Sequence, residues 1–203
     1  GFIWDFVDQA LYWPSSAEGT DHVFVYGGDF NDYDPSDNSF CCNGIIAADR
    51  TLHPHAYEVA YQYRSILTTP VDVLAGKVNV YNENFFIDLS RYMLDWEICV
   101  DGNAVLSGCV TSLTAGSQQT STVDLGYDAE DICDASGVAD IRNHDVYLNV
   151  RYTLKKADGL MPAGSQVAYD QIIVNEAEIP VFENGSGLPE YAADGSLHSF
   201  CAD

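Results

Sequence analysis

The stretch that decides the fold is Asp145-Val-Tyr-Leu-Asn-Val-Arg-Tyr-Thr-Leu154. Val146, Leu148, Val150 and Tyr152 alternate with more polar residues, so one face of the segment is more apolar, as in a half-buried β-strand. Short apolar segments of similar length, separated by turns, occur at 71–74, 77–82, 94–100, 104–111, 120–125 and 167–174. About seven short strands over roughly 100 residues predict an immunoglobulin-like antiparallel β-sandwich.

The first 64 residues carry a different pattern. Residues 2–7 are almost continuously apolar, which predicts a parallel strand covered on both faces. A long polar and glycine-rich stretch follows over about residues 9–43, and apolar residues then recur at helical spacing from Pro54 to Arg64. Strand, long loop and helix together predict one β/α unit, of the kind that closes a (β/α)8 barrel. The expected fold is therefore mainly β, with a terminal β/α unit in front of the sandwich.

The chain is strongly acidic. Of 203 residues, 31 are Asp or Glu and 8 are Lys or Arg, which gives a formal charge of -23. Such a charge repels phosphate backbones and anionic lipid heads, so nucleic acid and membrane surfaces are poor partners. The six cysteines form no C-x-x-C pair and no zinc spacing. We expect mostly free thiols, and a disulfide between Cys99 and Cys109 is the open alternative.

Four short sequence motifs point to a protein family. Gly1-Phe-Ile-Trp-Asp-Phe-Val-Asp-Gln9, Tyr26-Gly-Gly-Asp-Phe30, Phe40-Cys-Cys-Asn-Gly44 and Ala48-Asp-Arg-Thr-Leu-His-Pro54 occur in this order. Together they closely resemble the end of the catalytic barrel of the large multidomain bacterial β-galactosidases of glycoside hydrolase family 2. The resemblance implies that residues 1–64 are the incomplete end of that barrel, 65–183 the following immunoglobulin-like domain, and 184–203 a linker toward a further domain.

The resemblance also implies roles for three residues. The family tryptophan matched by Trp4 lines the galactose pocket, where a flat apolar face suits the C–H side of a sugar ring; the alternative is that Trp4 fills the top of the barrel. The backbone carbonyl matched by Phe40 and the side-chain oxygen matched by Asn43 bind a sodium ion beside the substrate, as neutral oxygen ligands. A further aspartate ligand lies upstream in the family, so this sodium site is expected to be incomplete. Magnesium stays open as a cofactor of the parent enzyme, and this sequence offers no ligand for it.

No residue of this chain is expected to be catalytic. A retaining β-glycosidase needs two carboxyl groups about 5 Å apart, and the family glutamates that supply them lie on earlier parts of the barrel. We therefore expect a segment of a β-galactosidase that hydrolyses terminal β-galactosides by a retaining mechanism, and we expect the segment to be inactive alone. The other domains of the same chain are its expected partners, in a homo-oligomeric parent. A cytoplasmic and a periplasmic location both stay open.

Two alternatives are open at this point. A stand-alone carbohydrate-binding or structural β-sandwich would make residues 1–64 an extension, and an exposed row of aromatic side chains would favour it. Tyr147 and Tyr152, however, fall on opposite faces of their strand. A fragment of a related exo-glycosidase, such as a glucuronidase or a mannosidase, would share the fold, but the Phe-Cys-x-Asn-Gly word belongs to the galactosidase branch.

Overall fold

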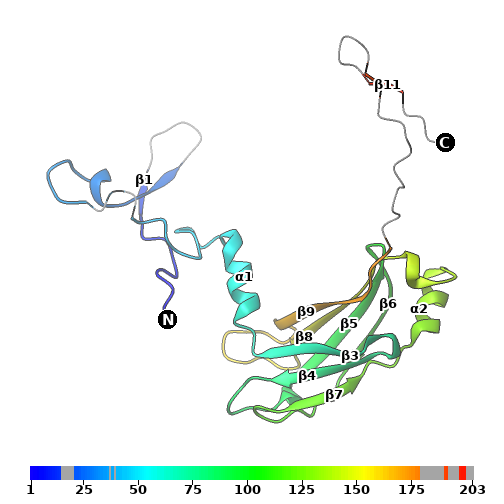
Figure 1. The fold of residues 1–203 in the computed structure, drawn as a ribbon. Coiled ribbons are helices and arrows are strands. Elements are labelled where there is room, and N and C mark those ends of the chain that lie inside the picture. The colour runs from blue at the N-terminus through cyan, green and yellow to red at the C-terminus, as the bar shows by residue number, and fades with distance from the viewer. Residues whose placement is uncertain (15–20, 37, 39, 179–189, 192–196, 200–203) are drawn as a thin grey trace.

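The structure is a computed structural model that describes residues 1–14, 21–36, 38, 40–178, 190–191 and 197–199. Its main body is a β-sandwich of two antiparallel sheets (Figure 1). The strands are β3 (Ile66–Asp72), β4 (Lys77–Asn82), β5 (Tyr92–Val100), β6 (Asn103–Val110), β7 (Thr120–Asp124), β8 (Val146–Leu154) and β9 (Gln166–Asn175). One sheet has the order β3-β4-β7 and the other the order β6-β5-β8-β9. This arrangement confirms the predicted mainly β fold with an immunoglobulin-like sandwich.

The hydrophobic core lies between the two sheets. Val146, Leu148, Val150 and Tyr152 of β8 are all buried, and they pack with buried residues of β3, β4 and β7 from the facing sheet. The hydroxyl oxygens of Thr68 and Tyr152, which come from opposite sheets, lie 2.7 Å apart inside this core. Because burying one aliphatic side chain stabilises a fold by roughly 1.5–3 kcal/mol, the alternation read in the sequence is what holds the two sheets together.

Short helices fill the connections between the strands. α2 (Ala129–Ser136) begins after Asp128, whose carboxylate accepts hydrogen bonds from the first backbone N–H groups of the helix. It ends at Gly137, where φ is 74°, a left-handed conformation that favours glycine. Its buried side chain, Ile132, joins the core of the sandwich. Three 3-10 turns, η2 (Val73–Ala75), η3 (Leu89–Arg91) and η4 (Ile141–Asn143), lie between other strands.

The predicted strand at residues 2–7 is wrong. Val7 makes an isolated parallel bridge to Ile46, and the residues before it form no ladder. Phe2 is fully exposed and Trp4 is 68% exposed. A parallel barrel strand is held by hydrogen bonds to neighbours on both edges and by cover on both faces. Among the described residues this segment has a hydrogen-bonded neighbour on one edge only, at residues 43–46.

The predicted helix is present, whereas the predicted long loop is partly structured. α1 (Pro54–Gln62) carries Pro54 in its first turn, as expected. Within the loop region, β1 (Leu11–Pro14) and β2 (His22–Val25) form an antiparallel hairpin, and η1 (Gly27–Asp29) follows. The rings of Tyr12 and His22 stack across the hairpin with centroids 4.7 Å apart, which is the kind of cross-strand contact that stabilises a two-stranded sheet.

The predicted strand at 71–74 is misplaced. β3 already begins at Ile66 and ends at Asp72, and η2 follows it. Pro70 therefore lies inside a strand. This is allowed because β3 is an edge strand, where a residue without a backbone N–H can face away from the ladder.

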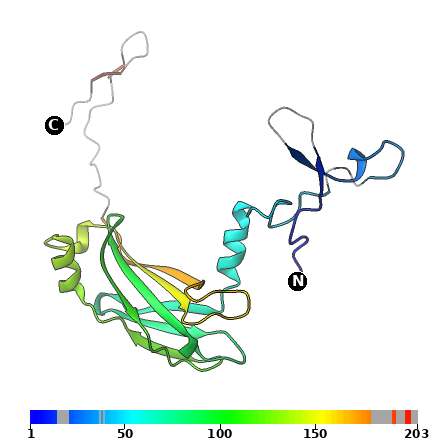
Figure 2. The same ribbon diagram turned by 180° about the vertical axis from the view of Figure 1, so that it is seen from behind.

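A buried ion pair fastens α1 to the sandwich. The Arg64 Nη2 lies 2.7 Å from Oδ1 of Asp170 on β9, and the two side chains are only 12% and 6% exposed. Asp170 also accepts hydrogen bonds from the Tyr61 hydroxyl and the Thr68 backbone N–H. The Arg64 guanidinium lies over the Tyr61 ring, 3.7 Å from its centroid. α1 thus leaves the sandwich from a fixed point beside β9 and projects away from it (Figures 1 and 2).

The described thiols are free, as expected: Cys41, Cys42, Cys99, Cys109 and Cys133. In the β5–β6 ladder Cys99 lies opposite Ala104 and Cys109 lies opposite Asp95, so the alternative of a Cys99–Cys109 disulfide is wrong. Beyond residue 178 the structure describes β10 (Glu190–Tyr191) and β11 (Leu197–Ser199), which pair antiparallel. The rest of the expected linker 184–203 lies outside the described residues.

Candidate functional site

Two distant stretches of the N-terminal part lie side by side. Backbone hydrogen bonds join residues 5–9 to residues 41–46, beginning with the Asp5 N–H, which donates to the Asn43 carbonyl over 2.8 Å. Trp4 precedes Asp5 directly, so it lies next to the stretch that carries Asn43. The structure therefore brings together two of the three residues for which the sequence predicts a binding role.

Gly44 lies at the centre of this pairing and is buried. Its N–H donates to Asp8 Oδ1 over 2.7 Å. A Cβ atom at this position would lie 2.3 Å from the backbone nitrogen of Asp8 and 2.5 Å from the carbonyl carbon of Val7. Backbone atoms cannot move away as a flexible side chain would, so only glycine allows the two stretches to approach this closely.

Asp8 connects the paired stretches to the start of α1. Its Oδ2 lies 2.8 Å from Nε2 of His53, the residue that precedes the helix, and the Asp8 side chain is only 9% exposed. Nε2 of His55 lies 3.1 Å from the Gly44 carbonyl oxygen. The hydrogen bond to His53, and after it the bond from Gly44, hold the pKa of Asp8 below its ordinary value, although burial acts in the opposite direction.

We predict that the Asp8 contact fails only under acid conditions. Because the pKa of Asp8 is lowered in the fold, its stabilising contribution is complete above the unfolded-state value of about 3.9 and is lost as the pH falls through the folded-state value. The chemical shift of the Gly44 amide, followed by NMR from pH 6 to pH 2, should therefore titrate with a midpoint below about 3.9. The Asp8→Asn variant should remove this titration, and a wild-type midpoint at or above that of a free aspartate would contradict the assignment.

The expected binding residues differ in their surroundings. Trp4 and Phe40 are exposed, and their rings contact solvent. The side-chain nitrogen and oxygen of Asn43 are both buried and have no hydrogen-bond partner among the described residues. A buried amide without partners costs roughly 1–3 kcal/mol per group. The Asn43 amide therefore suits a polar ligand, and an oxygen-seeking cation is one such ligand.

Sequence reasoning missed Asp8, His53 and His55 as parts of this site. His53 does precede α1, but its ring also holds Asp8. The available signal for Asp8 was its place directly after an apolar run, at the end of the segment where a barrel carries its functional side chains.

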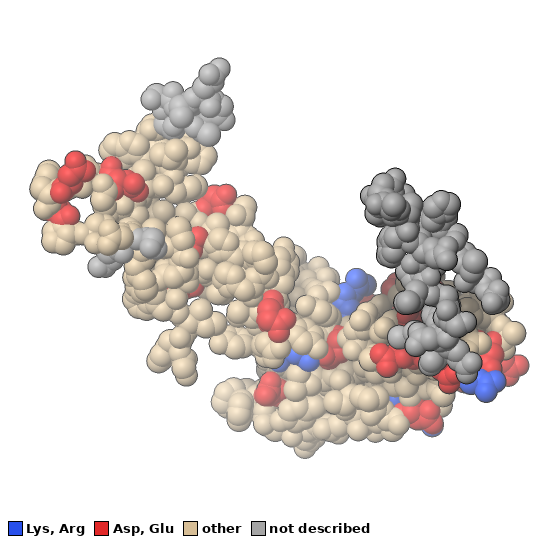
Figure 3. Space-filling view, turned by 45° about the horizontal axis from the view of Figure 1, so that its top comes forward, with Lys and Arg blue, Asp and Glu red and all other residues tan. Residues whose placement is uncertain are grey.

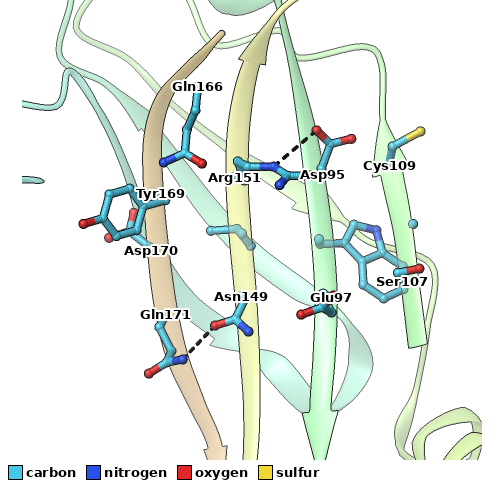
Figure 4. Close-up of a pocket in the computed structure, with 13 residues that line it drawn as sticks. Asp95, Glu97, Ser107, Cys109, Asn149, Arg151, Gln166, Tyr169, Asp170 and Gln171 are labelled. Carbon is cyan, nitrogen blue, oxygen red and sulfur yellow. Dashed lines mark hydrogen bonds and ion pairs between the residues drawn. The ribbon is translucent and has the colours of Figure 1, made fainter. Parts of the chain in front are cut away.

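A separate groove of about 760 Å³ lies on the outer face of the sheet β6-β5-β8-β9 (Figure 4). Its polar side chains pair across the strands: Gln171 Nε2 donates to Asn149 Oδ1 over 2.8 Å, and Arg151 Nε lies 3.9 Å from Asp95 Oδ2. None of the expected binding residues lines this groove. Its aromatic lining consists of Tyr169 and the buried Trp96, so it lacks the exposed aromatic row that a carbohydrate-binding face would favour.

The described part of the chain was searched for metal-binding clusters and for membrane-spanning helices. There, no group of three or more His, Cys, Asp or Glu side chains is arranged to hold a metal ion. No described helix is both long enough and apolar enough to cross a bilayer.

Two models of known protein families match separate parts of the chain. Residues 1–68 match the TIM barrel domain of glycosyl hydrolases family 2, and residues 78–175 match domain 4 of β-galactosidase. A β-galactosidase of Vibrio vulnificus is 34% identical over 176 residues, which cover 85% of this chain and 16% of that protein. A β-galactosidase of Psychromonas ingrahamii is 32% identical over 199 residues, 96% of this chain and 18% of that protein.

A third relative, the β-galactosidase of Photobacterium profundum, is 40% identical over 139 residues, 66% of this chain and 13% of that protein. The chain thus spans less than a fifth of the length of these three relatives. The chain belongs to the β-galactosidases of glycosyl hydrolase family 2, and it spans the C-terminal end of their TIM barrel domain and their domain 4.

Proposed function

We propose that this chain supports the substrate site of an enzyme that hydrolyses terminal β-galactosides with retention, and that it supplies no catalytic carboxylate itself. The observation that supports the proposal is the pairing of residues 5–9 with 41–46, in which Asp5, the residue after Trp4, donates its N–H to the Asn43 carbonyl. The relatives are β-galactosidases and match this chain over both parts. In a barrel enzyme the ends of the strands and the loops after them carry the site.

Trp4 is the proposed sugar-contacting residue. Trp4 is 68% exposed, so the flat face of its indole can pack on the C–H side of a galactose ring. Such contact removes apolar surface of both partners from water. The same exposure in a full-length protein without substrate would leave a hydrophobic platform at the mouth of the site.

A sodium ion is the proposed ligand of the Asn43 side-chain oxygen and the Phe40 backbone carbonyl. The partnerless, buried amide of Asn43 supports this assignment. A bound sodium ion would supply a positive charge to which sugar hydroxyl groups can donate their lone pairs. The role of the chain is to hold Asn43 in place, through the Asp5–Asn43 backbone bond and the close packing at Gly44. No residue of this chain is proposed as a magnesium ligand.

The sandwich is proposed to be a structural spacer. We divide the chain into the barrel end at residues 1–64, the sandwich domain at 65–183 and a connecting segment at 184–203. The buried Arg64–Asp170 pair at the first boundary supports a fixed joint there. The proposed partners are the other domains of the same polypeptide and further copies of it.

Replacing Trp4 tests the substrate site. In a full-length β-galactosidase that carries residues 1–203, Trp4→Ala should weaken binding of a galactose analogue by about 1–3 kcal/mol, or roughly 5- to 150-fold, because the stacking face is lost. Isothermal titration calorimetry on the folded variant measures this directly. The same protein should keep its thermal stability to within a few degrees, since Trp4 is exposed.

The matched control is Trp13→Ala, which removes an exposed indole from β1 of the same part of the chain. It should leave the affinity for the analogue unchanged. In the same assay Asn43→Ala should raise the sodium concentration needed for half-maximal binding. Unchanged affinity in a folded Trp4→Ala variant would show that Trp4 fills the barrel and does not touch the sugar.

A further inference from the structure

Two thiols lie in contact within the stretch that pairs with residues 5–9. Sγ of Cys41 and Sγ of Cys42 are 3.8 Å apart, which is within hydrogen-bonding distance for sulfur. Consecutive side chains of an extended strand point to opposite faces and do not meet in this way. The contact arises because Cys41 ends a turn. Cys42 is exposed and Cys41 is half-buried, so a small molecule can reach the pair from solvent.

The main chain around the two thiols is anchored. The Cys41 carbonyl oxygen accepts a hydrogen bond from the Gln9 N–H over 2.9 Å, and the Asn43 carbonyl oxygen accepts one from the Asp5 N–H over 2.8 Å. The Cys41 carbonyl belongs to the peptide bond that joins the two cysteines. Any rotation of this peptide bond therefore moves the acceptor of the Gln9 hydrogen bond.

A disulfide between the two thiols requires such a rotation. Disulfides usually join Cα atoms that lie about 4.4–6.8 Å apart, whereas neighbouring Cα atoms are only about 3.8 Å apart across a trans peptide bond. The ring that contains both sulfur atoms can close only if the peptide bond inside it twists. A disulfide that departs from the ordinary geometry stores strain and is easily reduced, which suits a reversible modification.

We propose that Cys41 and Cys42 form a reversible redox site, at which a small disulfide oxidises them to a disulfide between neighbouring residues and thereby loosens the pairing of residues 5–9 with 41–46. Cys42, the more exposed thiol, attacks the small disulfide as a thiolate, forms a mixed disulfide and releases one small thiol. Cys41 then attacks the Cys42 sulfur, so the bond between the two cysteines forms and a second small thiol leaves. Two protons and two electrons pass from the protein to the small disulfide.

The charge of the N-terminal part favours a cationic oxidant. Residues 1–64 contain ten Asp or Glu residues and two Lys or Arg residues, and Figure 3 shows acidic side chains over this part of the molecule. The charge of Asp8 also acts on the Cys42 thiol. Such a surface attracts cations and repels anions. Cystamine, a small disulfide with an amine at each end, is therefore a better reagent than oxidised glutathione, which carries a net negative charge.

The first test is the reaction of cystamine with a full-length β-galactosidase that carries residues 1–203. The hydrogen bond with Cys41, and after it the charge of a Cys41 thiolate, raise the pKa of the Cys42 thiol, so the reaction is run at about pH 8.5, the ordinary pKa of a thiol. Mass spectrometry should find the peptide with both cysteines lighter by two hydrogen atoms and free of cysteamine. Dithiothreitol should restore both thiols.

The internal control of this test is Cys109, which is exposed on β6 and should keep one cysteamine as a mixed disulfide. The Cys42→Ser variant should likewise keep one cysteamine on Cys41, because the second thiol that displaces it is gone. Wild-type protein that retains both thiols of the pair after Cys109 has reacted would overturn the proposal. So would a cysteamine that stays on the wild-type pair.

Hydrogen exchange measures the effect on the main chain. After oxidation, the backbone amides of residues 5–9 should exchange at least about fivefold faster than in the reduced protein, since the Gln9 N–H loses its acceptor. The double variant Cys41→Ser with Cys42→Ser is the matched control, and cystamine should leave its exchange unchanged. A disulfide that forms without faster exchange at residues 5–9 would also overturn the proposal.

The redox site goes beyond the proposed substrate site, although both involve the pairing of residues 5–9 with 41–46. Its two readouts, peptide mass and amide exchange, use no sodium, no galactoside and no turnover. The two proposals can therefore fail separately.

Discussion

Asp170→Ala is expected to lower the free energy of unfolding of the chain by about 3–5 kcal/mol, because it leaves the buried Arg64 guanidinium without its partner. Asp170 is 6% exposed and forms an ion pair with Arg64. Its carboxylate also accepts hydrogen bonds from the Tyr61 hydroxyl and the Thr68 backbone N–H. One substitution therefore removes an ion pair and the hydrogen bonds that fix the start of β3. Urea unfolding followed by circular dichroism of the sheet measures the loss.

Asp95→Ala is the matched control on the neighbouring part of the same sheet. Its ion pair with Arg151 is longer, at 3.9 Å, and more exposed, at 28% for Asp95 and 58% for Arg151, so its loss should cost no more than about 1 kcal/mol. The double variant Arg64→Leu with Asp170→Leu should recover part of the stability, since it removes both buried charges. A cost below about 1 kcal/mol for Asp170→Ala would show that the pair is not a structural joint.

The alternation of apolar and polar residues was sufficient to predict the sandwich, because each of its strands buries one face. β4 begins and ends where the pattern predicts, at Lys77 and Asn82, and β8 differs by a single residue at its start. The strand predicted at 71–74 is misplaced because β3 runs from Ile66 through Pro70 to Asp72. Edge strands tolerate proline, and the position of a strand in its sheet is not visible in a local pattern.

The missing predictions have two different causes. α2 had readable signals: Asp128 and Asp131 satisfy each other's backbone N–H groups in a capping box, and Gly137 ends the helix. Residues 2–7, by contrast, have the composition of a buried parallel strand but no partner strands among the described residues. Composition reports the environment for which a segment is suited, whereas pairing depends on which neighbours are present.

The candidate site was predictable only in part. Trp4, Phe40 and Asn43 came from sequence words shared with a family, and nothing in their local pattern indicated burial or exposure. The contacts of Asp8 were not predictable, because its partners Gly44 and His53 are 36 and 45 residues away in the chain. Long-range polar contacts of this kind follow from the fold and leave no periodic trace in the sequence.

Residues 1–203 alone are expected to show no galactosidase activity, at least about 10⁶-fold below a full-length enzyme in kcat/KM. Retaining hydrolysis needs one free carboxylate and one protonated carboxyl about 5 Å apart. The buried carboxylates in the described part of this chain already have structural roles. Asp170 forms the buried ion pair with Arg64. The two carboxylate oxygens of Asp8 form hydrogen bonds with the Gly44 N–H and the His53 ring.

The hydrogen bonds from Gly44 and His53 favour the ionised form of Asp8 and lower its pKa, whereas a general acid needs a carboxyl that is still protonated near neutral pH. A chromogenic β-galactoside assay of the purified chain beside the full-length protein tests the expectation. Contaminating host enzyme is the main source of a false signal, so any turnover must be traced to this chain through its own carboxylates. Activity that co-purifies with the chain and disappears in Asp8→Asn or Glu58→Gln would overturn the assignment of catalysis to other parts of the barrel. If the unsubstituted chain and both variants show no turnover, the site residues of this segment have binding and positioning roles alone.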